Sequence, residues 1–131
     1  MLEVYSKGVV VAPGAAIPLN TVAVDVGCNE KLVGASTIQF SKCGIYRVTV
    51  DCSAVAGAAG DIVIQLYKDG VPQPQAIQTE TAADTTSAHA MSFDTFVQVP
   101  HKSCPCMGTT DITVVNAGEE SVTFDVNVTV A

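Results

Sequence analysis

The chain has 131 residues, of which 48% are hydrophobic and only 15% charged, and its formal net charge is −7. Surface scaling gives a folded surface of ~6,500 Å² against ~19,600 Å² for the unfolded chain, enough burial for one core and one domain. Six basic residues against thirteen acidic ones, without a Lys/Arg cluster, exclude nucleic acid as a direct partner. The longest apolar runs, such as residues 9–12, are far below the ~20 residues of a membrane helix, so no membrane partner is expected.

The surplus of apolar over charged residues leaves little polar side-chain surface to cover a monomer. We therefore expect part of the surface to be covered by further copies of the same chain. The first residues lack a basic segment followed by an apolar one, so the sequence predicts synthesis in the cytoplasm without a secretory signal.

The five cysteines are an odd number, and a reducing compartment argues against a disulfide framework. Cys104 and Cys106 could hold a metal, but structural zinc sites use paired C-x-x-C spacing and four ligands. The sequence therefore favours plain thiols and predicts no metal and no cofactor.

Alternation of apolar and polar side chains, the two-residue period of a β-strand, dominates the chain. Every second residue between positions 46 and 52 is apolar, namely Tyr46, Val48, Val50 and Cys52. The same alternation returns at residues 122–130. No window of 12 residues carries a helical apolar stripe, and Gly, Thr and Val lower helix propensity throughout. In chain order, the sequence predicts strands near residues 9–11, 22–26, 37–40, 45–52, 62–67, 75–79, 90–99, 111–115 and 122–130.

Turn residues separate these strands. Asp69-Gly70 suits a tight hairpin, because glycine accepts a positive φ, and residues 116–118 turn the chain before the last strand. Pro72 and Pro74 lack the N–H that a central strand needs, so their segment is expected in a loop or at a sheet edge. Residues 54–60 and 79–86 are predicted as loops. Eight or more closely spaced strands indicate an all-β, antiparallel β-sandwich or jelly roll.

Three stretches carry a family resemblance over roughly the last hundred residues. They are Gly44-Ile45-Tyr46, the hairpin Leu66-Tyr67-Lys68-Asp69-Gly70-Val71-Pro72, and Cys104-Pro105-Cys106 before the penultimate strand. In this order they resemble the trimeric jelly roll of tumour necrosis factor, of the globular heads of complement's first component and of the tips of collagen-like spore-surface proteins. The chain looks most like the compact versions among virion proteins of tailed bacteriophages.

The resemblance implies a homotrimeric jelly roll at residues 21–131, preceded by an N-terminal arm or attachment segment at residues 1–20. It places the strands around Tyr46, Ser92 and Phe124 in one inner sheet that faces the threefold axis. The outer face of that sheet would then supply the trimer interface, with the residues Arg47, Thr49, Ala90, Ser92, Phe96, Thr123, Asp125 and Asn127.

Two of these residues have alternatives. Phe96 lies on the otherwise polar face of its strand, where an aromatic ring suits an interface, but an isolated exposed ring or a bulge that returns it to the core would also fit. Arg47, the only arginine, is expected on the same face as Asp51, Asp94 and Asp125, either in an interchain ion pair or as a solvated charge.

No pattern of catalytic residues is visible in the sequence. His89 and His101 are the only histidines and fit a strand start and a loop, without the partners of a catalytic triad. The aspartates do not form a calcium loop, and no phosphate-binding glycine motif occurs. We therefore expect that the chain is not an enzyme.

The resemblance implies a virion structural protein of a bacteriophage, a trimeric capsid decoration or head-fibre protein on the capsid surface. Its expected partner is the major capsid protein, which Leu2, Val4 and Tyr5 of the N-terminal segment would contact. The alternative is a receptor- or carbohydrate-binding tip module of a fibre, whose contacts would come from loops at residues 79–87 and 101–107, although these loops carry no aromatic residue. A secreted cytokine-like ligand conflicts with the missing signal sequence.

Overall fold

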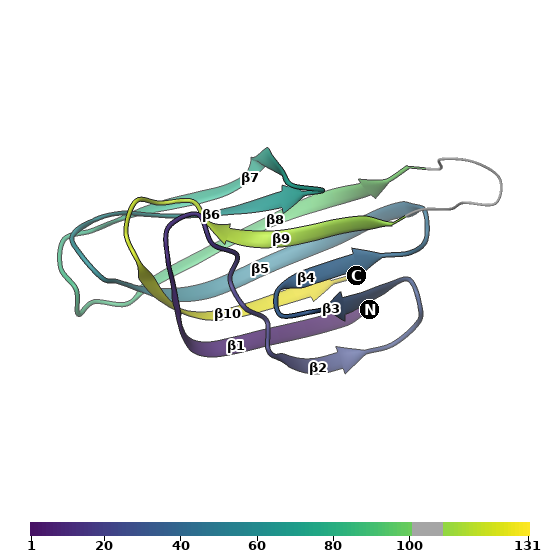
Figure 1. The fold of residues 1–131 in the computed structure, drawn as a ribbon, viewed down its shortest axis with the longest axis horizontal. Helices are drawn as coiled ribbons and strands as arrows, with labels where there is room; N and C mark the ends of the chain where they lie inside the picture. Colours follow the sequence, from purple (N-terminus) through teal and green to yellow (C-terminus); the bar gives the residue numbers. More distant parts are fainter. Residues whose placement is uncertain (101–108) are drawn as a thin grey trace.

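Two antiparallel sheets of five strands each pack face to face (Figure 1). The computed structural model describes residues 1–100 and 109–131, and the secondary structure of this part is entirely β. No helix that could cross a membrane occurs in these two ranges. The strands are β1 (Leu2–Val11), β2 (Thr21–Asp25), β3 (Glu30–Val33), β4 (Thr37–Phe40), β5 (Gly44–Ala56), β6 (Gly60–Lys68), β7 (Val71–Ala82), β8 (His89–Val99), β9 (Thr110–Asn116) and β10 (Val122–Val130).

The strand order of the two sheets is that of a jelly roll. The first sheet has the order β2-β1-β10-β5-β8, and the second has the order β3-β4-β9-β6-β7. Sequence neighbours therefore often lie in different sheets, and β1 and β10, from the two ends of the chain, pair along their length. The predicted all-β fold class is confirmed.

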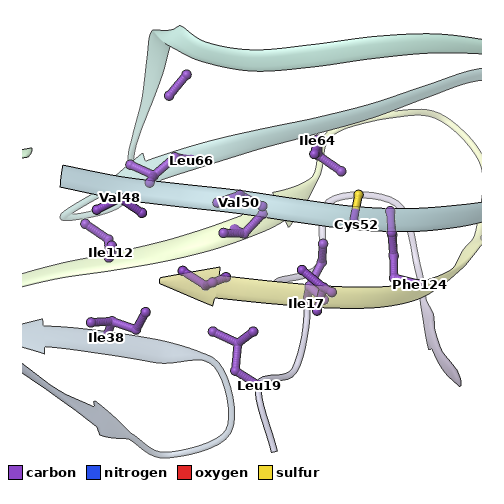
Figure 2. Packing of buried hydrophobic residues seen from close by; sticks show 14 of the residues in the cluster. Ile17, Leu19, Ile38, Val48, Val50, Cys52, Ile64, Leu66, Ile112 and Phe124 are labelled. Carbon is purple, nitrogen blue, oxygen red and sulfur yellow. The ribbon is translucent and has the colours of Figure 1, made fainter. Parts of the chain in front are cut away.

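The core lies between the sheets and follows the predicted alternation. Val48, Val50 and Cys52 of β5 and Phe124 of β10 face Ile64, Leu66 and Ile112 of the second sheet (Figure 2). Each of these side chains is at most 8% exposed, because successive strand residues point to opposite faces. The valines predicted near residues 22–26 differ. Val22 of β2 is 46% exposed and Val26, directly after β2, is 65% exposed, because β2 is an edge strand of the first sheet.

The turn between β6 and β7 confirms the predicted hairpin. Asp69 has φ 51° and Gly70 has φ 79°, the left-handed pair of a two-residue turn, and the flanking residues Lys68 and Val71 are paired. Pro72 and Pro74 lie in β7, an edge strand of the second sheet, as their missing N–H groups require.

Two predicted loops are shorter than expected. β5 continues to Ala56 and β7 to Ala82, so the connections reduce to residues 57–59 and 83–88. In both places the strand continues because its last residue pairs with a neighbouring strand: Ala56 pairs with Val122, and Ala82 pairs with Gly60. This pairing outweighs the weak strand propensity of alanine.

The N-terminal segment corrects our prediction of a separate arm. Residues 2–11 form the second strand of the first sheet, where Leu2 and Val4 are fully buried. The following stretch also joins the core: Ile17 and Leu19 are buried, and the Ile17 N–H donates to the Val114 carbonyl at 2.7 Å. Residues 1–20 are therefore part of the sandwich.

Candidate assembly face

The predicted interface residues all lie on the outer face of the first sheet. Strands β10, β5 and β8 are neighbours, so the predicted grouping of the strands around Tyr46, Ser92 and Phe124 is confirmed. We call the outward side of these three strands and of β1 the open face. Its members from the sequence prediction are Arg47, Thr49, Ala90, Ser92, Phe96, Thr123, Asp125 and Asn127, each exposed or half-buried.

Phe96 projects from the open face. Its side chain is 68% exposed, and β8 pairs with β5 without a register shift, so no bulge returns the ring to the core. Among the sequence alternatives, the bulge is wrong.

Ile45, which we did not predict as an interface residue, is 69% exposed on the same face. Ile45 pairs with Gln98 and Arg47 with Phe96, so Ile45 and the ring occupy diagonal positions on adjacent strands. The alternation in the sequence already placed Ile45 on the face of its strand opposite to Tyr46. This was the signal that could have identified Ile45 as an outward-facing residue.

Arg47 has its partner within the same chain. Its Nε donates to both carboxylate oxygens of Asp94, at 3.1 and 2.9 Å, and its terminal nitrogen also contacts this carboxylate. The Thr49 hydroxyl donates to the same group at 3.0 Å. The hydrogen bond from Arg47 holds the pKa of Asp94 below its ordinary value, and Asp94 raises the pKa of Arg47. Within one chain, Arg47 therefore has an intrachain partner that the sequence analysis did not name, and its side chain remains 60% exposed.

A shallow groove of about 280 Å³ hollows the open face between β1, β10 and β5. It forms where a bulge in β1 shifts the register between Ser6 and Val9, and Gly8, at φ +65°, donates its N–H to Asp125 Oδ1 at 2.7 Å. The groove is lined by Tyr5, Lys7, Asp51, Ser53, Asp125 and Asn127, among others.

The predicted attachment residues lie on opposite faces of β1. Tyr5 belongs to the open face, whereas Leu2 and Val4 point into the core and have no exposed surface for a partner. For these two residues the predicted capsid contact is wrong, because alternate residues of one strand face opposite ways.

The reactive side chains of the described residues do not converge on a site. His89 begins β8, as predicted, and no group of three or more potential metal ligands occurs in residues 1–100 and 109–131. Cys28 and Cys52 are free thiols, and burial raises the pKa of Cys52 to about 12. His101, Cys104, Cys106 and the loop at residues 101–107 lie outside the described residues.

Comparisons with known proteins agree with this fold. No family model and no curated protein matches the sequence. Among solved structures, the PRD1 vertex protein P5 is similar with a TM-score of 0.60 and 16% identity, over 99% of this chain and 94% of that one. Murine APRIL at pH 8.5, a member of the tumour-necrosis-factor family, has a TM-score of 0.60 and 8% identity over 97% of both chains. The predicted resemblance is therefore confirmed as a shared fold.

Proposed function

We propose that the chain is a non-enzymatic structural protein of a bacteriophage virion that assembles as a homotrimer through its open face. It decorates the capsid surface, as a decoration or head-fibre protein, and contacts the major capsid protein through one end of the sandwich. The observation that carries the proposal is the exposure of Phe96 and Ile45 on a five-stranded sheet face that no other part of the described chain covers.

Burial of these two side chains supports assembly. Each large apolar side chain stabilises an interface by about 1.5–3 kcal/mol when it is fully buried, and an aromatic anchor in a mostly polar patch is a frequent hot spot. Three copies related by a threefold rotation form a closed ring, so the patch is buried in three equivalent contacts and no copy keeps an unpaired interface. The Arg47–Asp94 pair supports this further, because the charges of these two neighbours of Phe96 are already paired with each other.

The virion assignment draws on the fold that the chain shares with a protein named as a vertex protein of PRD1. The net charge of −7 fits a protein on the outside of a particle, because like charges keep particles apart.

The trimer is tested by Phe96→Asp. A carboxylate in place of the ring loses the apolar contact and puts three negative charges into the interface, so we expect the mass from light scattering to fall from three chains towards one at micromolar concentration. Circular dichroism should keep its β-sheet spectrum, because Phe96 contributes nothing to the core. Ile45→Asp should act in the same direction.

The matched control is Ile77→Asp, since Ile77 is 41% exposed on β7 of the second sheet. This variant should keep the wild-type mass. A wild-type protein that is monomeric, or a Phe96→Asp variant that keeps three chains, contradicts the proposed trimer.

The virion location is tested by cryo-electron microscopy of intact particles with and without the gene. Density on the capsid surface that is lost with the gene supports the decoration role. Density confined to the tail contradicts it.

A further inference from the structure

The open face carries a projecting ring and a hollow in two different places. Phe96 projects from β8, an edge strand of the first sheet, whereas the groove lies between β1, β10 and β5. Three residues that line the groove, Tyr5, Asn127 and Asp51, are ladder partners and form one row across the sheet. On β8 this row ends at Ser92, four residues before Phe96.

The ring of Phe96 cannot fill the groove of its own chain. Four residues along a strand span about 13 Å, and the two strand spacings from β8 to β10 span about 10 Å. The ring and the centre of the groove are therefore about 16 Å apart on one face, which is further than a phenylalanine side chain reaches. β5 and β10 separate β8 from β1 (Figure 1), and β8 pairs with β5 without a register shift, so no local bend shortens this path.

The groove has the size and the lining that suit one aromatic ring. Its volume is about 280 Å³, whereas an apolar cavity of about 150 Å³ already binds benzene. Tyr5 lines it, and two aromatic rings attract each other edge to face. Its shape is set by the bulge in β1 and by the hydrogen bond from Gly8 to Asp125, so the groove exists before any ring enters.

The charges in the groove favour a neutral aromatic ring. Its lining includes the carboxylates of Asp51 and Asp125 and the ammonium of Lys7, so acids outnumber bases. An aromatic ring is negative on its faces and positive at its edge, so its edge is attracted to carboxylates. An acidic side chain in the same place would be repelled.

The symmetry of a three-copy ring requires two different contact surfaces on each copy. About a threefold axis, each copy meets one neighbour with one surface and the other neighbour with a second surface. Phe96, together with Ile45, offers the first surface, and the groove offers the second. Both lie on the open face, so one arrangement can use both in every contact.

We propose that Phe96 of one copy inserts into the groove between β1, β10 and β5 of the next copy. The groove is thus a binding site whose ligand is an aromatic side chain of a second copy of this chain. This inference rests on the trimer proposed above and states which residues meet in it. The competing arrangement brings three Phe96 rings together at the threefold axis and leaves the grooves uncovered.

The experiment replaces Phe96 by p-benzoylphenylalanine, which keeps an aromatic ring and bonds to C–H groups in contact with it when it is irradiated. Mixing chains of natural and heavy nitrogen isotopes identifies cross-links between copies by mass spectrometry. We expect such cross-links to fall in residues 5–7, 51–53 and 125–127. The same photoreactive residue in place of Ile77, which is exposed on the second sheet, should give no cross-link between copies.

The outcomes separate this proposal from the proposed function. A trimer whose cross-links join β8 to β8, or fall outside the groove, overturns the insertion and leaves the trimer intact. A chain that light scattering shows to be monomeric contradicts both.

A pair of charged variants tests the same contact without a photoreactive group. In a dilution series followed by light scattering, the trimer of Phe96→Lys should dissociate at a concentration about tenfold lower than that of Phe96→Asp, because the ammonium meets carboxylates in the groove. Asp51→Asn should reduce this difference. Glu119→Gln is the matched control, since Glu119 is exposed in the loop before β10 and does not line the groove. Equal weakening by Lys and Asp is the result expected for rings that meet at the axis, and it would overturn the insertion.

Discussion

The two faces of the first sheet place the same residue type in opposite surroundings. Phe124 on β10 is fully buried between the sheets, whereas Phe96 on β8 is 68% exposed on the open face. Only β5 separates the two strands in the sheet. The inner ring stabilises the fold of each chain, and the outer ring can stabilise only contacts with another molecule.

The second sheet sharpens this difference. Its large apolar side chains that are more than a third exposed, in the described part of the chain, are Val33, Val71 and Ile77, and all three belong to its edge strands. The first sheet also exposes Ile45 on β5, an interior strand. Ile45 lies near the start of this strand, diagonal to Phe96, so an exposed aliphatic side chain beside an exposed ring distinguishes the open face from the outer face of the second sheet.

The largest expected effect comes from truncating the inner ring. Phe124→Ala leaves a cavity between the sheets and should lower the free energy of unfolding by about 3–5 kcal/mol. Urea denaturation followed by circular dichroism measures this loss. The measurement needs a concentration series, because assembly adds a concentration-dependent contribution to the apparent stability.

Phe96→Ala is the matched truncation on the outer face. In the dilute, dissociated chain its free energy of unfolding should stay within about 0.5 kcal/mol of wild type, as for other surface substitutions. Similar losses in the two variants would contradict the assignment of the two faces.

A smaller effect is expected for a polar residue on the buried side. Asn116 is fully buried, its Nδ2 donates to the carbonyls of Val11 and Glu120 at 2.9 Å each, and its Oδ1 accepts from the Gly118 N–H at 3.2 Å. Asn116→Ala leaves these backbone groups without partners and should cost about 1–3 kcal/mol in the free energy of unfolding.

Asn127 on the open face provides the control for Asn116. Its Oδ1 accepts a hydrogen bond from the Thr129 hydroxyl at 3.2 Å, and water can replace that contact. Asn127→Ala should change the free energy of unfolding by less than about 0.5 kcal/mol. The same urea denaturation measures both variants, and equal losses would mean that burial does not set the cost.

The inner face could be predicted from the sequence because its signal is local. The alternation in β5, β6 and β10 assigns each side chain to one of two faces before any strand pairing is known. The same reasoning put Phe96 and Ile45 opposite the core. It could not say which outward face belongs to which sheet, and for the grouping of strands we depended on a family resemblance.

The features that the sequence did not predict depend on pairing between distant residues. Leu2 and Val4 alternate over too short a stretch to identify a strand, and their burial follows from the pairing of β1 with β10. The carboxylate that binds Arg47 could be chosen among several aspartates only when the register of β5 and β8 was known. The groove on the open face combines residues of β1, β10 and β5, so no local motif could indicate it.

The smallest expected effect concerns the Arg47–Asp94 pair on the open face. The hydrogen bond from Arg47 lowers the pKa of Asp94 in the folded chain, so the pair stabilises the fold above the unfolded pKa of aspartate, about 3.9, and is lost as the pH falls through the lower folded pKa. Arg47→Gln should therefore raise the pKa of Asp94 towards its ordinary value, as measured by carboxyl NMR titration. Asp84 is the control, because its pKa is lowered by the backbone N–H groups of Ser87 and Thr86 and should not change. An Asp94 that titrates identically in both proteins would show that Arg47 is not its partner, and would reopen an interchain role for this charge.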